Sequence, residues 1–165
     1  MSRAAGATIV ALLVALAATS CAGPDPGSEA APPLLDRAAY VRDVQPIFEA
    51  RCATLDCHGN ADRPLRLYAA TGLRLAADRD LAITAEELTA NLEAASGLDD
   101  PPNVDERLVL LKALGRMKHS GDAVWAGPSD PQYMCVRGWL AGASASAEIV
   151  AACATAATQV ALPPP

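Results

Sequence analysis

The chain has 165 residues, which is enough for one domain and an additional segment. It holds 13 basic and 19 acidic residues, and its net charge of −6 argues against binding to nucleic acid or electrostatic binding to an anionic lipid surface. Aromatic residues make up only 4% of the chain, so its core has little bulk per residue, and small domains of this kind often need a disulfide or a bound group.

Residues 1–20 have the features of an export signal. Arg3 gives a short positive start, and residues 7–17 form an apolar run that is shorter than the ~20 residues needed to span a bilayer. Ala18-Thr19-Ser20-Cys21 resembles the lipobox of bacterial lipoproteins, although the commonest form has Leu three residues before the Cys. We therefore expect an exported protein, in the periplasm or at the cell surface, anchored to a membrane by lipid on Cys21. The alternative is an ordinary signal peptide that leaves Cys21 as a free thiol.

Residues 21–35 are rich in Pro, Gly, Ala and Ser, which predicts a flexible tether between the lipidated cysteine and a domain over residues 36–160. Removal of the signal, whose one charge is Arg3, would change the net charge to −7. An acidic surface of this kind could steer the protein toward a basic partner.

The first predicted helix leads into a cysteine. An apolar stripe with helical spacing consists of Tyr40, Val41, Val44, Ile47 and Phe48. Pro46 lies inside this stripe, and proline is tolerated only in the first turn of a helix. The sequence therefore predicts a short turn up to Gln45 and a helix from Pro46 to Cys52.

Four later helices are predicted from their capping residues. Thr84 with Glu87 forms a capping box, and Asn103 can cap the next helix, which Gly115 could end. Asp130-Pro131 begins another helix, and Ser146 caps the last. With no alternating strand pattern and no internal repeat, we expect an all-α domain with long loops at 59–83 and 115–129.

The strongest chemical signal is Cys52-Ala53-Thr54-Leu55-Asp56-Cys57-His58-Gly59. In c-type haem attachment, two cysteines form thioether bonds to the porphyrin, and a His directly after the second binds the iron; the usual motif is C-x-x-C-H. Here the first Cys lies five residues before the second instead of three. Helical positions five apart point about 140° away from each other, so residues 53–56 have to bulge outward, and Thr54 and Asp56 are suited to support such a turn.

The chain resembles the class I cytochrome c family over residues 40–142. The matching residues are Val44-x-Pro46-Ile47-Phe48, Cys52, Cys57-His58-Gly59, Leu65-x-Leu67, Met117-Lys118-His119-Ser120-Gly121, Asp130-Pro131-x-Tyr133 and Trp139. The resemblance implies a small cytochrome c-like helical domain around one covalent haem c, held by Cys52, Cys57 and His58. It implies an electron-transfer protein with a redox partner protein, not an enzyme. It also implies a second iron ligand on the loop before the last covering helix: Met117 is the first candidate and His119 the alternative.

Other interpretations of the cysteines stay open. Cys135 and Cys153 are a candidate disulfide, which an oxidising compartment permits. A haem-less structural or interaction lipoprotein would also pair Cys52 with Cys57. A zinc site could use Cys52, Cys57, His58 and His119, and peroxidase-like catalysis would need an open distal position. Trp125, Arg116 and Lys118 are candidate partners of the haem propionates, although a loop anchor and solvated side chains are the simpler interpretations.

Overall fold

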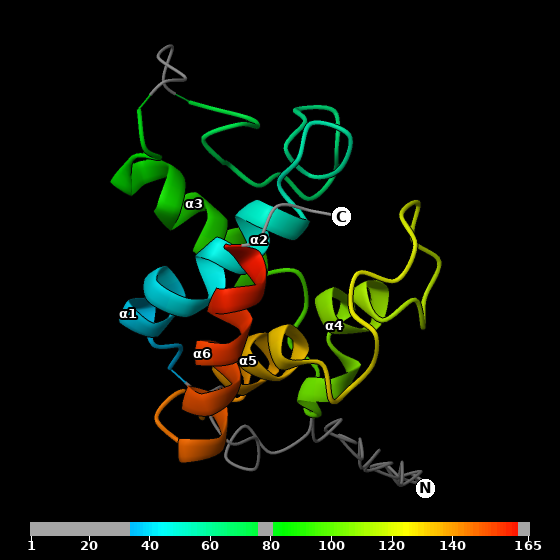
Figure 1. The fold of residues 1–165 in the computed structure, drawn as a ribbon. Coiled ribbons are helices and arrows are strands. Elements are labelled where there is room, and N and C mark those ends of the chain that lie inside the picture. Colours follow the sequence, from blue (N-terminus) through cyan, green and yellow to red (C-terminus); the bar gives the residue numbers. More distant parts are fainter. Residues whose placement is uncertain (1–33, 76–80, 162–165) are drawn as a thin grey trace, which may run out of the picture. The chain divides into compact units, whose positions relative to one another are not determined.

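The computed structural model describes residues 34–75 and 81–161 (Figure 1). The predicted signal peptide, the proposed lipidation site Cys21 and the tether up to residue 33 lie outside the described residues. The described part forms helices and no named strand, so the all-α prediction is confirmed. None of its helices is long and apolar enough to cross a membrane.

The N-terminal helical segment starts earlier than predicted and runs through Pro46. It consists of α1 (Arg37–Ala39), the π-helix η1 (Tyr40–Val44) and α2 (Gln45–Arg51). The backbone N–H of Gln45 donates to the carbonyl of Tyr40, five residues back. This wider turn accommodates a proline that has no N–H to donate and whose ring would crowd the carbonyl four residues back in a regular α-helix. The predicted turn before Pro46 was therefore wrong.

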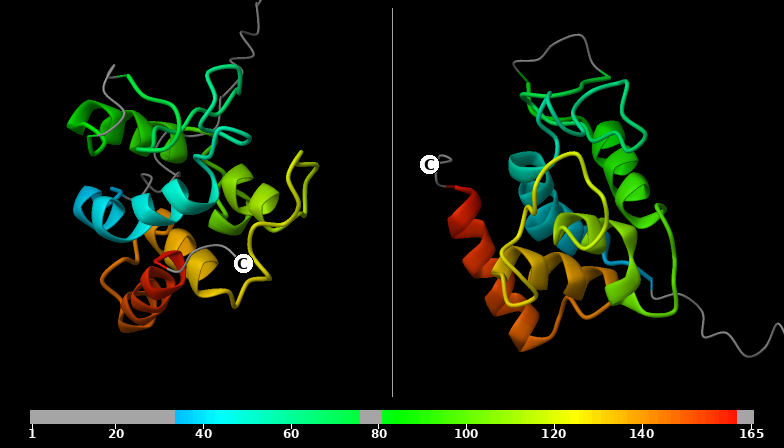
Figure 2. Two further views of the ribbon diagram at one scale, coloured as in Figure 1. Left: turned by 45° about the horizontal axis from the view of Figure 1, so that its top comes forward. Right: turned by 90° about the vertical axis from the view of Figure 1, so that its right-hand side faces the viewer.

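Helices α5 (Pro131–Leu140) and α6 (Ala147–Val160) lie against each other and contact the N-terminal segment (Figures 1 and 2). The predicted caps are confirmed, since Asp130 accepts from the N–H of Gln132 and Ser146 from that of Ile149. The predicted disulfide, Cys135–Cys153, joins the two helices.

Trp139 connects α5 to the start of the domain. Its ring lies 4.9 Å from the ring of Tyr40, and its indole N–H donates to the carbonyl of Asp36 at 3.0 Å. Both aromatic side chains are fully buried. This contact joins α5 to the residues that begin the domain.

Helix α3 (Ala85–Ser96) has the predicted capping box, with Thr84 and Glu87 each bound to the other's backbone. Its inner face carries two polar side chains. Glu87 and Asn91 are fully buried, whereas Leu88 and Leu92 are partly exposed.

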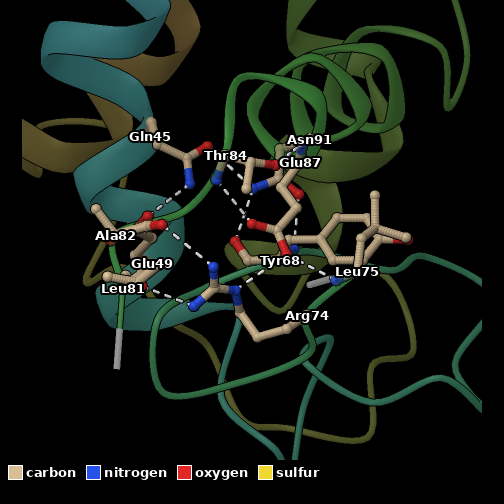
Figure 3. Close-up of polar contacts among 10 residues, drawn as sticks. All are labelled: Gln45, Glu49, Tyr68, Arg74, Leu75, Leu81, Ala82, Thr84, Glu87 and Asn91. Atoms are coloured by element: carbon tan, nitrogen blue, oxygen red, sulfur yellow. Dashed lines mark hydrogen bonds and ion pairs between the residues drawn. The ribbon is translucent and has the colours of Figure 1, made fainter. Parts of the chain in front are cut away.

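These two polar side chains fasten the preceding loop to α3 (Figure 3). The Glu87 carboxylate accepts hydrogen bonds from the Arg74 guanidinium at 3.0 Å, the Leu75 N–H at 2.6 Å and the Thr84 N–H at 2.8 Å. Asn91 accepts from the Tyr68 N–H at 2.6 Å and donates to the Tyr68 carbonyl at 2.7 Å. The amide of Asn91 also donates to Gln45 of α2, and Arg74 donates to the carbonyls of Leu81 and Ala82.

The helix predicted after Asn103 is split in two. Asn103 caps the 3₁₀-helix η2 (Val104–Glu106), and α4 (Leu108–Ala113) follows after one extended residue, Arg107. The guanidinium of Arg107 is buried and donates to the carbonyls of Ser96 and Asp99, which explains why the chain turns there. Gly115 follows α4 with a φ of 67°, in agreement with the predicted helix end.

Candidate functional site

A cavity of about 1160 Å³ lies between the segment that follows α2, helices α3 and α4, and the loop after α4. This volume exceeds the ~300–1,000 Å³ typical of small-molecule pockets. Most of the exposed surface inside it is apolar. Six residues that the sequence analysis named as candidates for the site line this one cavity. They are Cys52, Cys57, His58, Lys118, His119 and Trp125.

The widened C-x4-C turn is closed by backbone hydrogen bonds. The Thr54 carbonyl accepts from the N–H groups of Cys57 at 3.0 Å and Gly59 at 2.9 Å, and the His58 N–H donates to the Cys52 carbonyl at 2.9 Å. The turn therefore bulges as predicted. Among the described residues, however, it is supported by backbone carbonyls and not by the side chains of Thr54 and Asp56.

Glycine is required on both sides of this turn. The carbonyl oxygen of Ala53 would lie 2.1 Å from a Cβ at Gly59 and 2.3 Å from a Cβ at Gly72. Real Cβ contacts are never this short, and the clashing atom belongs to the backbone and cannot move aside. The Ala53 peptide is thus clamped between two glycines, and Gly59 comes directly after the predicted iron ligand.

Cys52 and Cys57 both have free thiols, in contrast to the disulfide-bonded pair. Cys57 is exposed, whereas Cys52 is only partly accessible. Burial of its sulfur raises the pKa of Cys52 to about 12, and the nearby Cys57 adds to the shift. At neutral pH the Cys52 sulfur is therefore a protonated thiol and a weak nucleophile.

His58 is fixed in position and in tautomer. Its ring Nδ1 lies 3.0 Å from the carbonyl oxygen of Leu65, which can only accept, so Nδ1 carries the proton and Nε2 keeps its lone pair. Its own carbonyl accepts from the N–H of Leu67 at 2.8 Å. Burial lowers the pKa of His58, which favours the neutral ring that binds metals.

The ring of His119 lies close and nearly parallel to the ring of His58. The ring centroids lie 5.9 Å apart and the planes differ by 19°. Two imidazoles on opposite sides of one metal ion, each with a metal–nitrogen distance of about 2.0–2.1 Å, have centroids roughly 6 Å apart. The pair has this spacing although 61 positions of the sequence separate the two histidines.

His119 lies on the loop that follows α4, drawn in yellow in Figure 1. The ends of this loop are close together, because the N–H groups of Val124 and Trp125 both donate to the carbonyl of Ala113. Within it, His119 is the one partly buried residue between Gly115 and Ala123, and the others are exposed. A compact loop with joined ends and one inserted side chain resembles an Ω-loop.

Of the two candidates for the distal ligand, His119 alone lines the cavity. Met117 is 41% exposed and is not among the lining residues. Met117 was the first candidate because thioether ligation opposite His raises the reduction potential and suits electron transfer. The order of residues along a loop cannot show which of two neighbours turns inward.

Two buried nitrogen atoms at the cavity have no hydrogen-bond partner among the described residues. They are Nδ1 of His119 and Nε1 of Trp125, whose side chain is 2% exposed. A buried N–H without an acceptor is costly, and such groups are rare in proteins. The Trp125 indole is therefore suited to donate to an acceptor on a bound molecule.

Basic side chains outnumber acidic ones in the lining. Among the described residues, neither acidic side chain there, Asp56 or Glu93, forms an ion pair, and none of the basic side chains of the lining forms one either. The basic residues are Arg51, Arg63, Arg66, Lys112 and Lys118. This excess suits a ligand that carries carboxylates. The sequence pointed only to Lys118, because these residues come from separate segments.

The cysteines and histidines do not form a multi-ligand metal site. Within residues 34–75 and 81–161, no three side chains of His, Cys, Asp or Glu gather closely enough to hold a metal ion. The zinc site predicted as an alternative from Cys52, Cys57, His58 and His119 is therefore not assembled. Arg116, the other predicted propionate partner, lines a separate surface pocket with Asp105 and Arg137.

Comparisons with known proteins do not add a relative. No protein-family model, curated protein or solved structure matches this chain. The geometry of the cavity is therefore the basis for assigning a function.

Proposed function

We propose that this protein is a mono-haem c-type electron-transfer protein, in which His58 and His119 would hold the iron and Cys52 and Cys57 would form the thioether bonds. The observation that carries the proposal is a pair of nearly parallel imidazoles, with ring centroids 5.9 Å apart, at a large and mainly apolar cavity. The finer classification of the fold as cytochrome c-like is part of this proposal.

The number of protein ligands favours a porphyrin over a bare ion. Structural zinc sites normally take four protein ligands, and catalytic ones take three. Here two imidazoles lie close together, and the described part of the chain has no group of three or more side chains that could hold a metal ion. Two opposed nitrogens are sufficient when a macrocycle supplies the remaining four ligands. The size and apolar lining of the cavity agree with such a group.

The haem would supply an iron atom that exchanges one electron by cycling between its ferric and ferrous forms. His58 keeps its Nε2 lone pair available because Nδ1 donates to Leu65, and a hydrogen bond of this kind orients a ligating ring and raises its basicity. The Trp125 indole would donate to a haem carboxylate, supported by the surrounding cations. Fully buried Phe48 and Leu67 exclude water from the inner wall.

The choice of His119 has a consequence for the redox potential. Ligation by Met opposite His raises the potential of a haem. A chain with His at both positions should therefore have a lower potential than one with His58 and Met117. The proposed role is electron transfer to and from a redox partner protein, on the outer side of an export membrane, with a lipid anchor at Cys21.

The test is the intact mass of the protein after expression with and without a haem-attachment system. We expect a mass increase of one haem and a Soret band that remains with the protein after acid–acetone extraction. A chain that gains no mass and shows a Cys52–Cys57 disulfide in peptide mapping would contradict the proposal and favour a haem-less lipoprotein. Export and lipidation are tested separately, by the mass of the N-terminal peptide.

A further inference from the structure

The walls of the cavity are held by contacts that do not involve its interior. On one side Asn91 binds both backbone groups of Tyr68, a lining residue, and Glu87 binds the backbone of Leu75 and Thr84. These polar groups are fully buried in α3, so the loop they hold is fixed by the protein itself. Fully satisfied buried networks of this kind rigidify the structure around them.

Two further anchors act on the remaining walls. The turn from Cys52 to Gly59 is clamped by its glycine contacts to the Ala53 carbonyl. Loop 114–123 is closed at its base by the Ala113 carbonyl, and the Lys112 ammonium donates to the Lys118 carbonyl at 3.1 Å. Neither anchor uses a cysteine sulfur. The backbone that carries both histidines is therefore held without a bond to the sulfur of Cys52 or Cys57.

We infer that the chain binds an iron porphyrin reversibly through His58 and His119, with no need for either thioether bond. This inference rests on the proposed function and deepens it, because it makes coordination a separate event from covalent attachment. Cys52 and Cys57 then retain a group that the cavity has already recognised.

The experiment uses the Cys52→Ala/Cys57→Ala variant of the exported chain, expressed without a haem-attachment system and titrated with hemin. We expect saturation at one equivalent, a low-spin six-coordinate spectrum and complete removal of the haem by acid–acetone. In the same background, His119→Ala should give a high-spin spectrum and at least tenfold weaker binding, while Met117→Ala serves as the matched control and should leave the spectrum low-spin. His58→Ala should abolish the six-coordinate spectrum.

Three outcomes would overturn the inference: binding that does not saturate, a spectrum unchanged by both histidine substitutions, or no binding by a variant whose circular dichroism shows it to be folded. The exposed-site variant Cys57→Ala provides a second test if the double variant does not fold, and it should bind hemin in the same way. The wild-type chain with the haem-attachment system separates the two proposals. Covalent haem on wild type together with no binding by the folded cysteine variants would overturn this inference alone.

Discussion

The two histidines line one cavity from walls that are built differently. His58 follows a clamped turn, donates to Leu65 and is backed by the buried network of Glu87 and Asn91. His119 lies in an exposed loop, and its ring makes no hydrogen bond to the described residues. One wall thus fixes a ligand through many contacts, whereas the other presents a ligand on a loop held at its base. The difference indicates that the two positions would tolerate change to different degrees.

The largest expected effect separates the two histidines. His58→Ala should lower the yield of haem-loaded protein at least about tenfold, since even the outer-shell partners of a metal ligand are commonly worth 10–100-fold in metal affinity. His119→Ala should keep covalently attached haem but give a high-spin spectrum. Haem content per protein and the visible spectrum of both variants check this. Equal losses of covalent haem in the two variants would contradict the inference that the two walls tolerate substitution to different degrees.

The second prediction concerns the fixed wall. Arg74→Met should lower the free energy of unfolding by about 3 kcal/mol, because it removes the cation beside a carboxylate that is fully buried. Arg42→Met is the matched control, since the Arg42 side chain in its ion pair with Asp43 is 65% exposed and the pair should contribute little. Urea denaturation of both variants measures the difference. Similar midpoints for the two would show that the buried pair does not stabilise this wall.

The third prediction concerns the base of the loop wall. Gly115→Ala should cost about 1 kcal/mol, since the left-handed φ of 67° is unfavourable for alanine. The new Cβ would also lie 3.3 Å from the Cβ of Ala123. Gly121→Ala, near the tip, should be neutral, because its Cβ would meet the His119 ring at an ordinary 3.6 Å. Thermal unfolding compares them, and a greater loss at Gly121 would contradict the assignment of the base as the fixed point.

The smallest expected effect is on pH dependence. Asp105 accepts from Arg137 and from Tyr133 of α5, and the hydrogen bond from Arg137 is the main cause that lowers the pKa of Asp105 from 3.8 to about 2. A lowered pKa means that the stabilisation is complete above pH 4 and is lost as the pH falls toward 2. Because both partners are more than one-third exposed, Asp105→Asn should cost less than about 1 kcal/mol at pH 7.

Unfolding curves at pH 7 and pH 2 measure this difference, which should shrink at the lower pH. A gap between wild type and Asp105→Asn that stays constant over this range would show that the carboxylate charge is not involved.

The local signals in the sequence predicted much of the fold. The caps at Thr84, Asp130 and Ser146 depend on a side chain and an N–H two or three residues away, so they can be recognised without the tertiary structure. The continuous helical segment formed by α1, η1 and α2 could not be recognised in this way, because the pattern of apolar residues does not reveal a π-turn. The sequence also did not predict that Glu87 and Asn91 face inward, since their partners Arg74 and Tyr68 lie in a loop with no regular pattern.

The candidate site was predicted in part for the same reason. Cys52, Cys57 and His58 are neighbours in the sequence, so their motif can be read directly. The pairing of His58 with His119, the buried indole of Trp125 and the five cations all depend on how distant segments meet. The acceptor that orients His58 is the backbone carbonyl of Leu65, and the type of side chain at position 65 does not indicate this role.

The peptide of Ala53, wedged between two glycines, makes the length of the cysteine turn a property of the fold. Deleting two residues to restore the usual C-x-x-C-H spacing would pull this peptide out of its slot and disturb Gly72, whose segment continues to the anchors on α3. Deleting the two residues would therefore also disrupt the segment that contains Gly72. An enzyme that attaches haem to this protein would have to recognise the shape of the loop between Cys52 and Cys57. The number of residues between the two cysteines would not be enough to identify its substrates.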